Sequence, residues 1–326
     1  MIFNKLDKKG IILKIGSIND FDSGMVESPA IWFDVKRKKY GMVYVGYKLI
    51  KEKFTGYNSV AFPKIGLAWS EDLLTWEKDI HNPIFGPSIT NPFSYDSFGT
   101  SAPFIFYENN KYYLFYFGLT EKGYEAGYKT LNLAISEDLL NWKRYKKNPI
   151  ITPYGNGFRR DAIWHPNVIK HNSIYYLFFN SSGVYNSIEE EFIGYAKSTN
   201  LLDWEIDDKN SPILVGSFKN TAWDSSGRAG DPCVFRYNNK WYMAYYSWDK
   251  VHTQDGIAWT TDEEFPLGWR PFENNPILKV GKEGSFDELH AGKPFIIIKD
   301  KMYYHFYTAV DRTQKREIAL AIGILE

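Results

Sequence analysis

The sequence has little of the chemistry that identifies several common protein classes. It contains one cysteine, Cys233, so no disulfide can form within the chain. Its 39 basic residues balance 39 acidic residues, and no long basic stretch is present, so we expect no nucleic-acid partner. The six histidines do not cluster at metal-ligand spacing, and glycine-rich nucleotide motifs are absent. We therefore expect no cofactor and no metal. The sequence does not decide whether a cation binds in the central channel.

Long apolar runs are also missing. No segment approaches the roughly 18 apolar residues of a membrane span, so no membrane partner is expected. The first residues lack the apolar stretch of about 7–15 residues that a secretory signal needs. We therefore expect a cytoplasmic protein, and the sequence does not address its oligomeric state.

Aromatic residues and internal repeats are abundant. Aromatics make up 18% of the chain, which is typical of sheet proteins because aromatic side chains cover pleated surfaces well. A segment of the type S-x-D-L-x-x-W recurs and is followed each time by a near-copy of Asn-Pro-Ile. The repeated tryptophans are Trp76, Trp142, Trp204 and Trp269. Such regular recurrence predicts a repeat architecture rather than a β-sandwich.

A second marker fixes the number of units. A proline opens an apolar strand five times, at Pro29, Pro103, Pro166, Pro232 and Pro294. Each unit then reads as four strands, so we predict an all-β fold: a five-bladed β-propeller with four-stranded antiparallel blades, filling residues 1–326 as one domain. The last unit ends at its third strand. We expect the segment around Ile12 to supply its fourth strand and to close the ring.

The first strand of each blade lines the channel of a propeller, so function is sought where these strands begin. The five segments are 22–29, 96–103, 159–166, 226–232 and 287–294. The outer parts of the units are near-identical, yet these segments carry different combinations of Glu, Asp, His, Arg and Lys. Converging on one axis, such charges are costly unless they are paired or used. They are therefore the candidate site.

The chain resembles the five-bladed glycoside hydrolases of family 43, with its relatives 32, 62, 68 and 117, and more distantly family 130. The S-x-D-L-x-x-W turns, the Asn-Pro-Ile segments and the starts Glu27-Ser28-Pro29 and Asp231-Pro232 carry this resemblance across all five units. It implies a general base Asp before a proline and a general acid Glu two blades later. The order here differs, because Glu27 stands in the first unit and Thr100 occupies an expected Asp position.

Read cyclically from the fourth unit, the order matches the family pattern. Asp231 then corresponds to the base, Glu288 or His290 follows, and Glu27 occupies the acid position. The rival interpretation uses Asp161 as base with His165 or His290 as acid, since family 117 is similar in using a histidine. Each carboxylate also has a structural alternative: Glu27 and Asp231 as buried caps, and Asp161 as an ion-pair partner of a neighbouring arginine.

The remaining candidates are substrate-binding residues. Basic side chains at the strand starts either neutralise the carboxylates or hold an anionic group of a ligand. The same segments also carry a tryptophan, a histidine and other polar residues. The predicted substrate-binding residues are Arg160, Trp164, His165, Arg228, Glu288, Lys293 and Thr100.

The resemblance predicts a glycosidase acting on a small oligosaccharide or glycoside by two-carboxylate chemistry. Two alternatives stay open. One is a phosphorylase like those of family 130, in which phosphate replaces water. The other is a carbohydrate-binding propeller without catalysis.

Overall fold

The computed structural model describes residues 7–217 and 223–324, which form twenty β-strands and one three-residue 3-10 helix, η1 (Tyr57–Ser59). In this part of the chain, no helix is long and apolar enough to cross a membrane. Three separate sheets have four antiparallel strands each. They are β2 (Met25–Asp34), β3 (Lys39–Leu49), β4 (Val60–Ser70) and β5 (Glu77–Lys78); β6 (Gly99–Glu108), β7 (Lys111–Leu119), β8 (Thr130–Ser136) and β9 (Lys143–Arg144); and β10 (Ala162–His171), β11 (Ile174–Tyr185), β12 (Ile188–Ser198) and β13 (Glu205–Ile206).

The remaining strands form one eight-stranded sheet made of two antiparallel groups. One group is β14 (Gly230–Tyr237), β15 (Lys240–Trp248), β16 (Thr253–Thr261) and β17 (Arg270–Pro271); the other is β18 (His290–Lys299), β19 (Met302–Val310), β20 (Arg316–Ile324) and β1 (Asp7–Leu13). A single parallel pair, Thr253 with His290, joins them. This mixed sheet differs from the prediction of separate four-stranded blades. The cause is local, since β16 and β18 approach closely enough at this point to pair.

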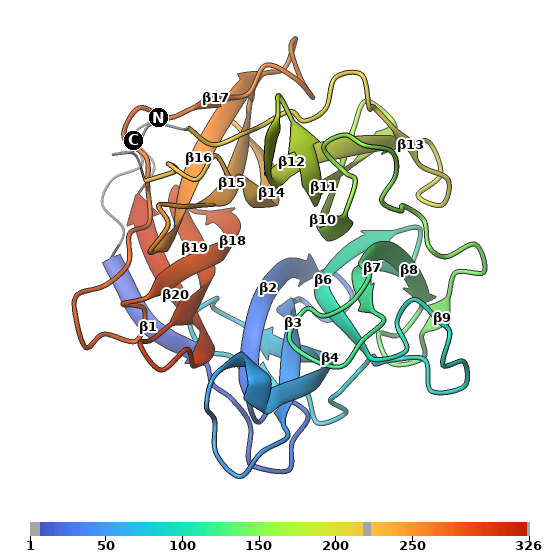
Figure 1. Ribbon diagram of the computed structural model, residues 1–326, viewed down its shortest axis with the longest axis vertical. Coiled ribbons are helices and arrows are strands. Elements are labelled where there is room, and N and C mark those ends of the chain that lie inside the picture. Colours follow the sequence, from blue (N-terminus) through green and yellow to red (C-terminus); the bar gives the residue numbers. More distant parts are fainter. Residues whose placement is uncertain (1–6, 218–222, 325–326) are drawn as a thin grey trace.

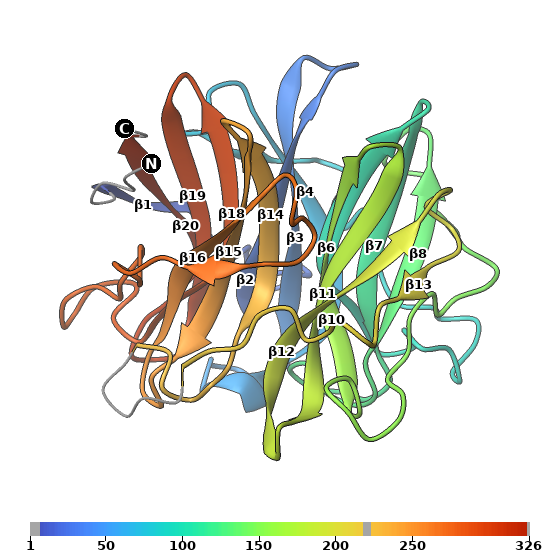
Figure 2. The same ribbon diagram turned by 90° about the horizontal axis from the view of Figure 1, so that it is seen from above.

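The sheets surround a common centre. Figure 1 shows β2, β6, β10, β14 and β18 as the strands nearest to it. Each of these inner strands contacts the next, and β18 contacts β2. Seen from the side in Figure 2, the sheets stand upright around the central axis. The N-terminal strand β1 pairs antiparallel with β20, with Leu13 opposite Ile318, so the two ends of the chain lie in one sheet.

The recurring sequence motifs are local structural devices. The Ser70 hydroxyl accepts hydrogen bonds from the backbone amides of Asp72 and Leu73. The Asp72 carboxylate accepts hydrogen bonds from the backbone amides of residues 74 and 75. The Trp76 indole donates to the Leu73 carbonyl at 3.1 Å. The second and third copies repeat these contacts, with Asn200 replacing the aspartate in the third. These side chains satisfy the hydrogen-bonding groups of the turn backbone.

The Asn-Pro segments fasten the third strand of a sheet. Asn82 accepts a hydrogen bond from the Leu67 amide at 2.7 Å and donates to the Leu67 carbonyl at 2.8 Å. The same two-way contact joins Asn148 to Leu133 and Asn275 to Ile257. The asparagine amide thus makes hydrogen bonds to the third strand just beyond the two-residue strands β5, β9 and β17.

A buried aspartate precedes most inner strands. Asp22 accepts hydrogen bonds from the Tyr44 hydroxyl at 3.0 Å and from Lys78 at 2.6 Å. Asp96 and Asp287 repeat the arrangement with Tyr116 and Arg144, and with Tyr307 and Lys8. Burying a carboxylate is tolerated here because each one has both a hydroxyl and a cationic partner. These aspartates are therefore structural.

Candidate active site

Every inner strand carries the same irregularity, and it shapes the centre of the molecule. The pairing register shifts once in each inner strand, at the step that contains the repeated proline. The residue before each proline has a positive φ between 42° and 59°. These residues are Ser28, Ala102, His165, Asp231 and Lys293. A bulge re-aims side chains and is common beside active sites, so five bulges turn five different side chains towards one axis.

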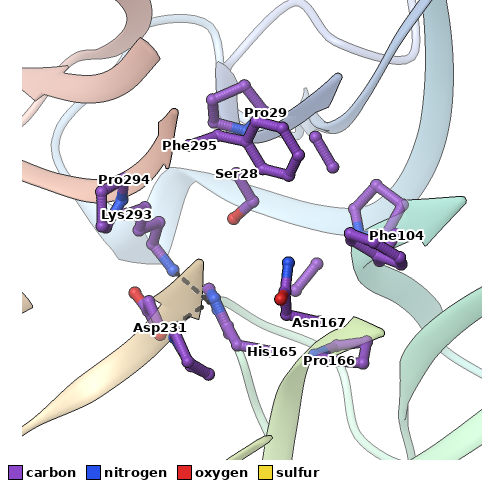
Figure 3. Close-up of a pocket in the computed structure, with 14 residues that line it drawn as sticks. Ser28, Pro29, Phe104, His165, Pro166, Asn167, Asp231, Lys293, Pro294 and Phe295 are labelled. Carbon is purple, nitrogen blue, oxygen red and sulfur yellow. Dashed lines mark hydrogen bonds and ion pairs between the residues drawn. The ribbon is translucent and has the colours of Figure 1, made fainter. Parts of the chain in front are cut away.

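Two cavities meet at this ring of bulges. The axial cavity has a volume of about 40 Å³ and is lined by residues of all five X-Pro steps, among them Ser28, Ala30, Asn167 and Phe295. Figure 3 shows its side chains pointing into one space, with His165 between Lys293 and Asp231. Its walls are mainly proline, alanine and phenylalanine.

The rim cavity is larger, at about 190 Å³, and more polar. It is lined by Tyr124, Glu125, Trp164, Glu191, Arg228, Asp231, Tyr246, Thr253, His290, Gly292, Lys293, Thr308, Val310 and Arg316. Among the described residues, only Asp231 and Lys293 line both cavities. A concave site with a few convergent polar groups is the default location for a ligand.

A chain of charged groups crosses the boundary between the cavities. His165 Nδ1 lies 2.9 Å from Asp231 Oδ1, and His165 Nε2 lies 3.1 Å from Lys293 Nζ. Lys293 in turn contacts Glu125 Oε1 at 3.0 Å. Burial alone would lower the pKa of His165, but the Asp231 and Glu125 carboxylates together outweigh burial and raise that pKa. Burial would raise the pKa of Glu125, whereas Lys293 and His165 hold it well below its usual value. Glu125 therefore stays ionised.

Glu191 and Asp231 are joined through one side chain. The Asn180 amide nitrogen lies 3.1 Å from Glu191 Oε2 and 3.4 Å from Asp231 Oδ1, so these two oxygens are at most 6.5 Å apart. Glu191 also accepts a hydrogen bond from the Tyr246 hydroxyl and lies 3.4 Å from Arg228 Nη1. Burial raises the pKa of Glu191, and the opposing effect of Arg228 does not cancel this increase. Glu191 is thus the carboxyl group of the cavity that is inclined to hold a proton.

Glu27 lies behind the rim cavity rather than in its lining. Its carboxylate is fully buried and accepts hydrogen bonds from Arg316 at 2.8 Å and from the Tyr124 hydroxyl at 3.1 Å. Lys293 Nζ lies 3.8 Å from its other oxygen. Arg316 extends towards the rim cavity and also bonds the Tyr57 hydroxyl at 2.6 Å. Glu27 therefore holds three side chains that line the rim cavity, the cations Arg316 and Lys293 and the aromatic Tyr124.

His290 is the histidine of the rim cavity. Its Nδ1 accepts a hydrogen bond from the Thr253 amide at 3.0 Å. Burial, with the nearby Arg316 and His252, lowers the pKa of His290 to about 4. It is therefore a neutral ring at pH 7 and lacks a proton on the nitrogen that faces Thr253.

The structure brings together six of the predicted residues around these cavities: Asp231, His290, Trp164, His165, Arg228 and Lys293. The other five predicted residues line neither cavity. Glu27 is buried behind Arg316, and Thr100 is fully buried in β6. Asp161 forms an exposed ion pair with Arg160, and Glu288 pairs with Arg312. The contact with Arg160 agrees with the structural alternative for Asp161, an ion pair with a neighbouring arginine. Its side chain lines neither cavity.

Sequence reasoning missed Glu125, Glu191, Tyr124, Tyr246 and Arg316, which all line the rim cavity. Tyr246 lies near the end of the second strand β15, and Glu191 and Arg316 lie on the third strands β12 and β20. The loop between β7 and β8 carries Tyr124 and Glu125. All five residues lie outside the segments before the inner strands, where the sequence predicts the site. The clustered glutamates at 189–191 were a signal in the sequence, since three acidic residues interrupt an otherwise apolar strand pattern. In the described residues, no group of three or more His, Cys, Asp or Glu side chains is arranged to hold a metal ion.

Comparisons with known proteins agree with the fold. The family model described as "Glycosyl hydrolases family 32 N-terminal domain" matches residues 65–209 and 102–265. A curated relative, the beta-1,2-mannobiose phosphorylase of Thermoanaerobacter sp. (strain X514), is 31% identical over 174 residues, which are 48% of this chain and 56% of that protein. The chain thus spans little more than half the length of this relative.

Solved structures match over nearly the whole chain. One described as "Glycoside hydrolase" has a TM-score of 0.76 at 19% identity and covers 97% of this chain and 92% of its own. A second comes from work on the GH130 family of mannoside phosphorylases, which "contains glycoside hydrolases that target beta-1,2 mannosidic linkages in Candida mannan". It has a TM-score of 0.71 at 14% identity, covering 98% of this chain and 94% of its own. At these identities the likeness concerns the fold alone.

Proposed function

The chain belongs to the family of the glycosyl hydrolase family 32 N-terminal domain, within the β-propeller glycoside hydrolases, and from this premise we propose that it hydrolyses a glycosidic bond in a small oligosaccharide or glycoside. The observation that carries the proposal is the pairing of two unlike carboxyl groups in one cavity. Glu191 is inclined to hold a proton, and Asp231 lies within 6.5 Å of it through the shared Asn180 donor. Glycoside hydrolysis needs such a pair.

Glu191 is the proposed general acid. It protonates the leaving glycosidic oxygen, which requires a carboxyl group whose pKa is raised. Burial supplies that increase, while Arg228 limits it. The Tyr246 hydroxyl and the Asn180 amide orient the carboxyl group from two sides.

Asp231 is the proposed base. One oxygen is held by His165 and Asn180, whereas Oδ2 accepts no hydrogen bond from any described residue. A carboxylate with one free oxygen can take a proton from water or stabilise the positive charge that develops on the sugar. Beside Asp231, the rim cavity is also lined by Glu125 and Lys293, whose opposite charges form an ion pair.

The charge of the rim cavity favours hydrolysis over phosphorolysis. Phosphorolysis needs cationic groups that are available to hold phosphate. In the described lining, Arg228, Lys293 and Arg316 each already face a carboxylate. A phosphate would bring further negative charge to Glu125, Glu191 and Asp231, which line the same cavity. The phosphorylase name of the curated relative nevertheless supports phosphorolysis as the second candidate.

The test compares water with phosphate as the acceptor. The full chain is incubated with a panel of aryl glycosides and with β-1,2-mannobiose, with and without inorganic phosphate, and the products are separated by mass spectrometry. Free sugar at a rate independent of phosphate is the expected result, and a sugar 1-phosphate formed only with phosphate would replace hydrolysis by phosphorolysis. Ligand binding by calorimetry without turnover of any substrate would indicate a carbohydrate-binding propeller.

The architecture that we propose for this enzyme is one domain of five blades. The single parallel pair between Thr253 and His290 then joins two neighbouring blades, and β1 supplies the fourth strand of the last one. The five register shifts at the X-Pro steps support this count, because one occurs in each inner strand. The cytoplasmic location and the absence of nucleic-acid partners stay predictions.

A further inference from the structure

A third cavity is formed by β3, β4 and β5 together with residues 19–22 and 79–83 on either side of these strands in the sequence. Its volume is about 480 Å³, and we call it the outer cavity. None of its described lining residues belongs to an inner strand or lines the axial or the rim cavity. Small-molecule sites typically have volumes of about 300–1,000 Å³, so the outer cavity has room for a sugar unit.

Lys64 of the outer cavity occupies a position that the repeated fold does not need to fill with a cation. It lies opposite Gly46 across the ladder of β3 and β4, as Thr130 lies opposite Gly118 across the ladder of β7 and β8. Thr130 is fully buried, whereas Lys64 is partly exposed and lines the outer cavity. The lysine is therefore a property of this one sheet and not of the repeat.

Lys78 differs in a similar way from its counterpart in the next sheet, Arg144. Each lies opposite the alanine of the repeated third strand. Arg144 contacts both the Asp96 carboxylate, at 2.7 Å, and the Gly86 carbonyl, at 2.5 Å. Lys78 contacts one described carboxylate, that of Asp22, at 2.6 Å. Because an ammonium group has three N–H donors, Lys78 keeps two of them for a ligand.

The lining of the outer cavity offers both donors and acceptors. Lys48 and Lys64 form no side-chain hydrogen bond or ion pair with any described residue, so their donors are available. The Asp20 carboxylate accepts one hydrogen bond from the described residues, from the Ser17 amide at 2.7 Å. The lining has three lysines and three aspartates, so its formal charge is zero. It therefore favours a neutral group with many hydroxyls, since each hydroxyl both donates and accepts.

Two apolar side chains complete this lining, Phe21 and Pro83. The Phe21 ring packs against Tyr44 with the ring centroids 6.1 Å apart, which fixes its position. An apolar wall beside a few convergent polar groups is the usual composition of a small-molecule site. A sugar ring matches both parts, because it has an apolar C–H face and a polar edge of hydroxyls.

We propose that the outer cavity is a second carbohydrate-binding site, which takes one neutral sugar unit. The sugar hydroxyls accept hydrogen bonds from Lys48, Lys64 and Lys78 and donate to Asp20, while Phe21 covers the apolar face of the ring. Since the outer cavity shares no described lining residue with the rim cavity, a sugar can occupy each of them at the same time. The inference does not depend on catalysis in the rim cavity.

The experiment follows two tryptophan indole signals by NMR in the full chain labelled with isotopic tryptophan. The Trp69 indole donates to Asp79 at 2.8 Å, and Asp79 lines the outer cavity, whereas Trp164 lines the rim cavity. Trp69→Phe and Trp164→Phe assign the two signals. Mannose, glucose and xylose are titrated separately, with sodium sulfate as the anionic comparison. We expect at least one sugar, and not sulfate, to move the Trp69 signal in a saturable way.

The matched variants locate the binding. Lys64→Met removes the ammonium group and keeps an unbranched stem of the kind that packs beside Gly86. We expect it to weaken the sugar affinity read from Trp69 about tenfold, because it removes a hydrogen bond from a charged donor. Lys143→Met is the control, an exposed lysine of β9 that lines none of the three cavities, and should keep the wild-type affinity. Thermal unfolding confirms that both variants are folded.

Three results would overturn the second site. A Trp69 signal that no sugar moves, while Trp164 responds or stays still, excludes sugar binding in the outer cavity. Movement of the Trp69 signal by sulfate alone makes the outer cavity an anion site. Equal affinities in wild type and folded Lys64→Met contradict the lysine contacts. None of these results bears on hydrolysis in the rim cavity, which the product assay with and without phosphate tests separately.

Discussion

Arg316 Nη1 lies 2.8 Å from Glu27 Oε2, an ion pair between residues 289 positions apart in the sequence. Both side chains are buried, and Arg316 reaches on to the Tyr57 hydroxyl. This contact joins β2 to β20 and fixes a guanidinium in the wall of the rim cavity. Glu27 therefore stabilises the site in the structure, which differs from the acid role that its sequence position predicts.

The first prediction concerns the stability of the Glu27→Gln variant. Removing one charge of a buried pair leaves the other uncompensated, so we expect a loss of about 3 kcal/mol in the free energy of unfolding. Denaturant unfolding followed by tryptophan fluorescence measures it. Glu264→Gln is the control, because Glu264 pairs with Arg270 at the surface and should contribute little. A Glu27→Gln variant of wild-type stability that has lost turnover would restore the acid role of Glu27.

The second prediction separates the acid from its neighbour. Glu191→Gln should lower kcat by about 10²- to 10⁴-fold for a glycoside with a poor leaving group. The loss should be much smaller for a dinitrophenyl glycoside, whose leaving oxygen needs no proton. Steady-state kinetics with both substrates give the comparison. Glu190→Gln tests the adjacent carboxylate, which also pairs with Arg228 but does not line the rim cavity. Equal losses for both leaving groups would argue against Glu191 as the acid.

The third prediction concerns the alkaline limit of activity. Glu191 must be protonated to act, so kcat/KM should fall as the pH rises through its pKa. Arg228 favours the ionised form and opposes the increase in this pKa caused by burial. Arg228→Met should therefore move the alkaline limb to higher pH, as a full pH profile would show. Arg312→Met, at an exposed ion pair away from both cavities, should leave the limb in place. A shift of the alkaline limb to lower pH in Arg228→Met would contradict the prediction.

The fourth prediction uses the titration of His290. Burial, Arg316 and His252 lower its pKa to about 4 in the folded chain, against an ordinary value of 6.5. The unfolded chain then binds more protons than the folded chain between these values, so His290 should reduce stability as the pH falls from about 6.5 to about 4. His290→Asn should weaken this acid-side loss. Unfolding free energies of both proteins across this range test it, and identical pH slopes would exclude the effect.

The sequence by itself determined the repeating unit and most of its local structure. The Ser70 and Asp72 contacts, the Asn82 bonds to Leu67 and the buried Asp22 all depend on residues that are close in sequence or repeated in most units. Such contacts leave a periodic signal. The X-Pro steps also marked the positions that turn towards the axis, and this is why His165, Asp231 and Lys293 were found.

Only the tertiary structure decided which charges meet. Glu191 reaches Asp231 through Asn180, and Arg316 reaches Glu27 from the far end of the chain. Glu191 and Arg316 share one position of the repeat, two residues before Ile193 and Ile318, but the residue type at this position differs between the two units, so the repeat marks neither as functional. Their pKa values follow from burial and from the sign of the nearest charge, and both are set by how the sheets pack around the axis. The local signals thus located the site, and packing assigned the proposed roles within it.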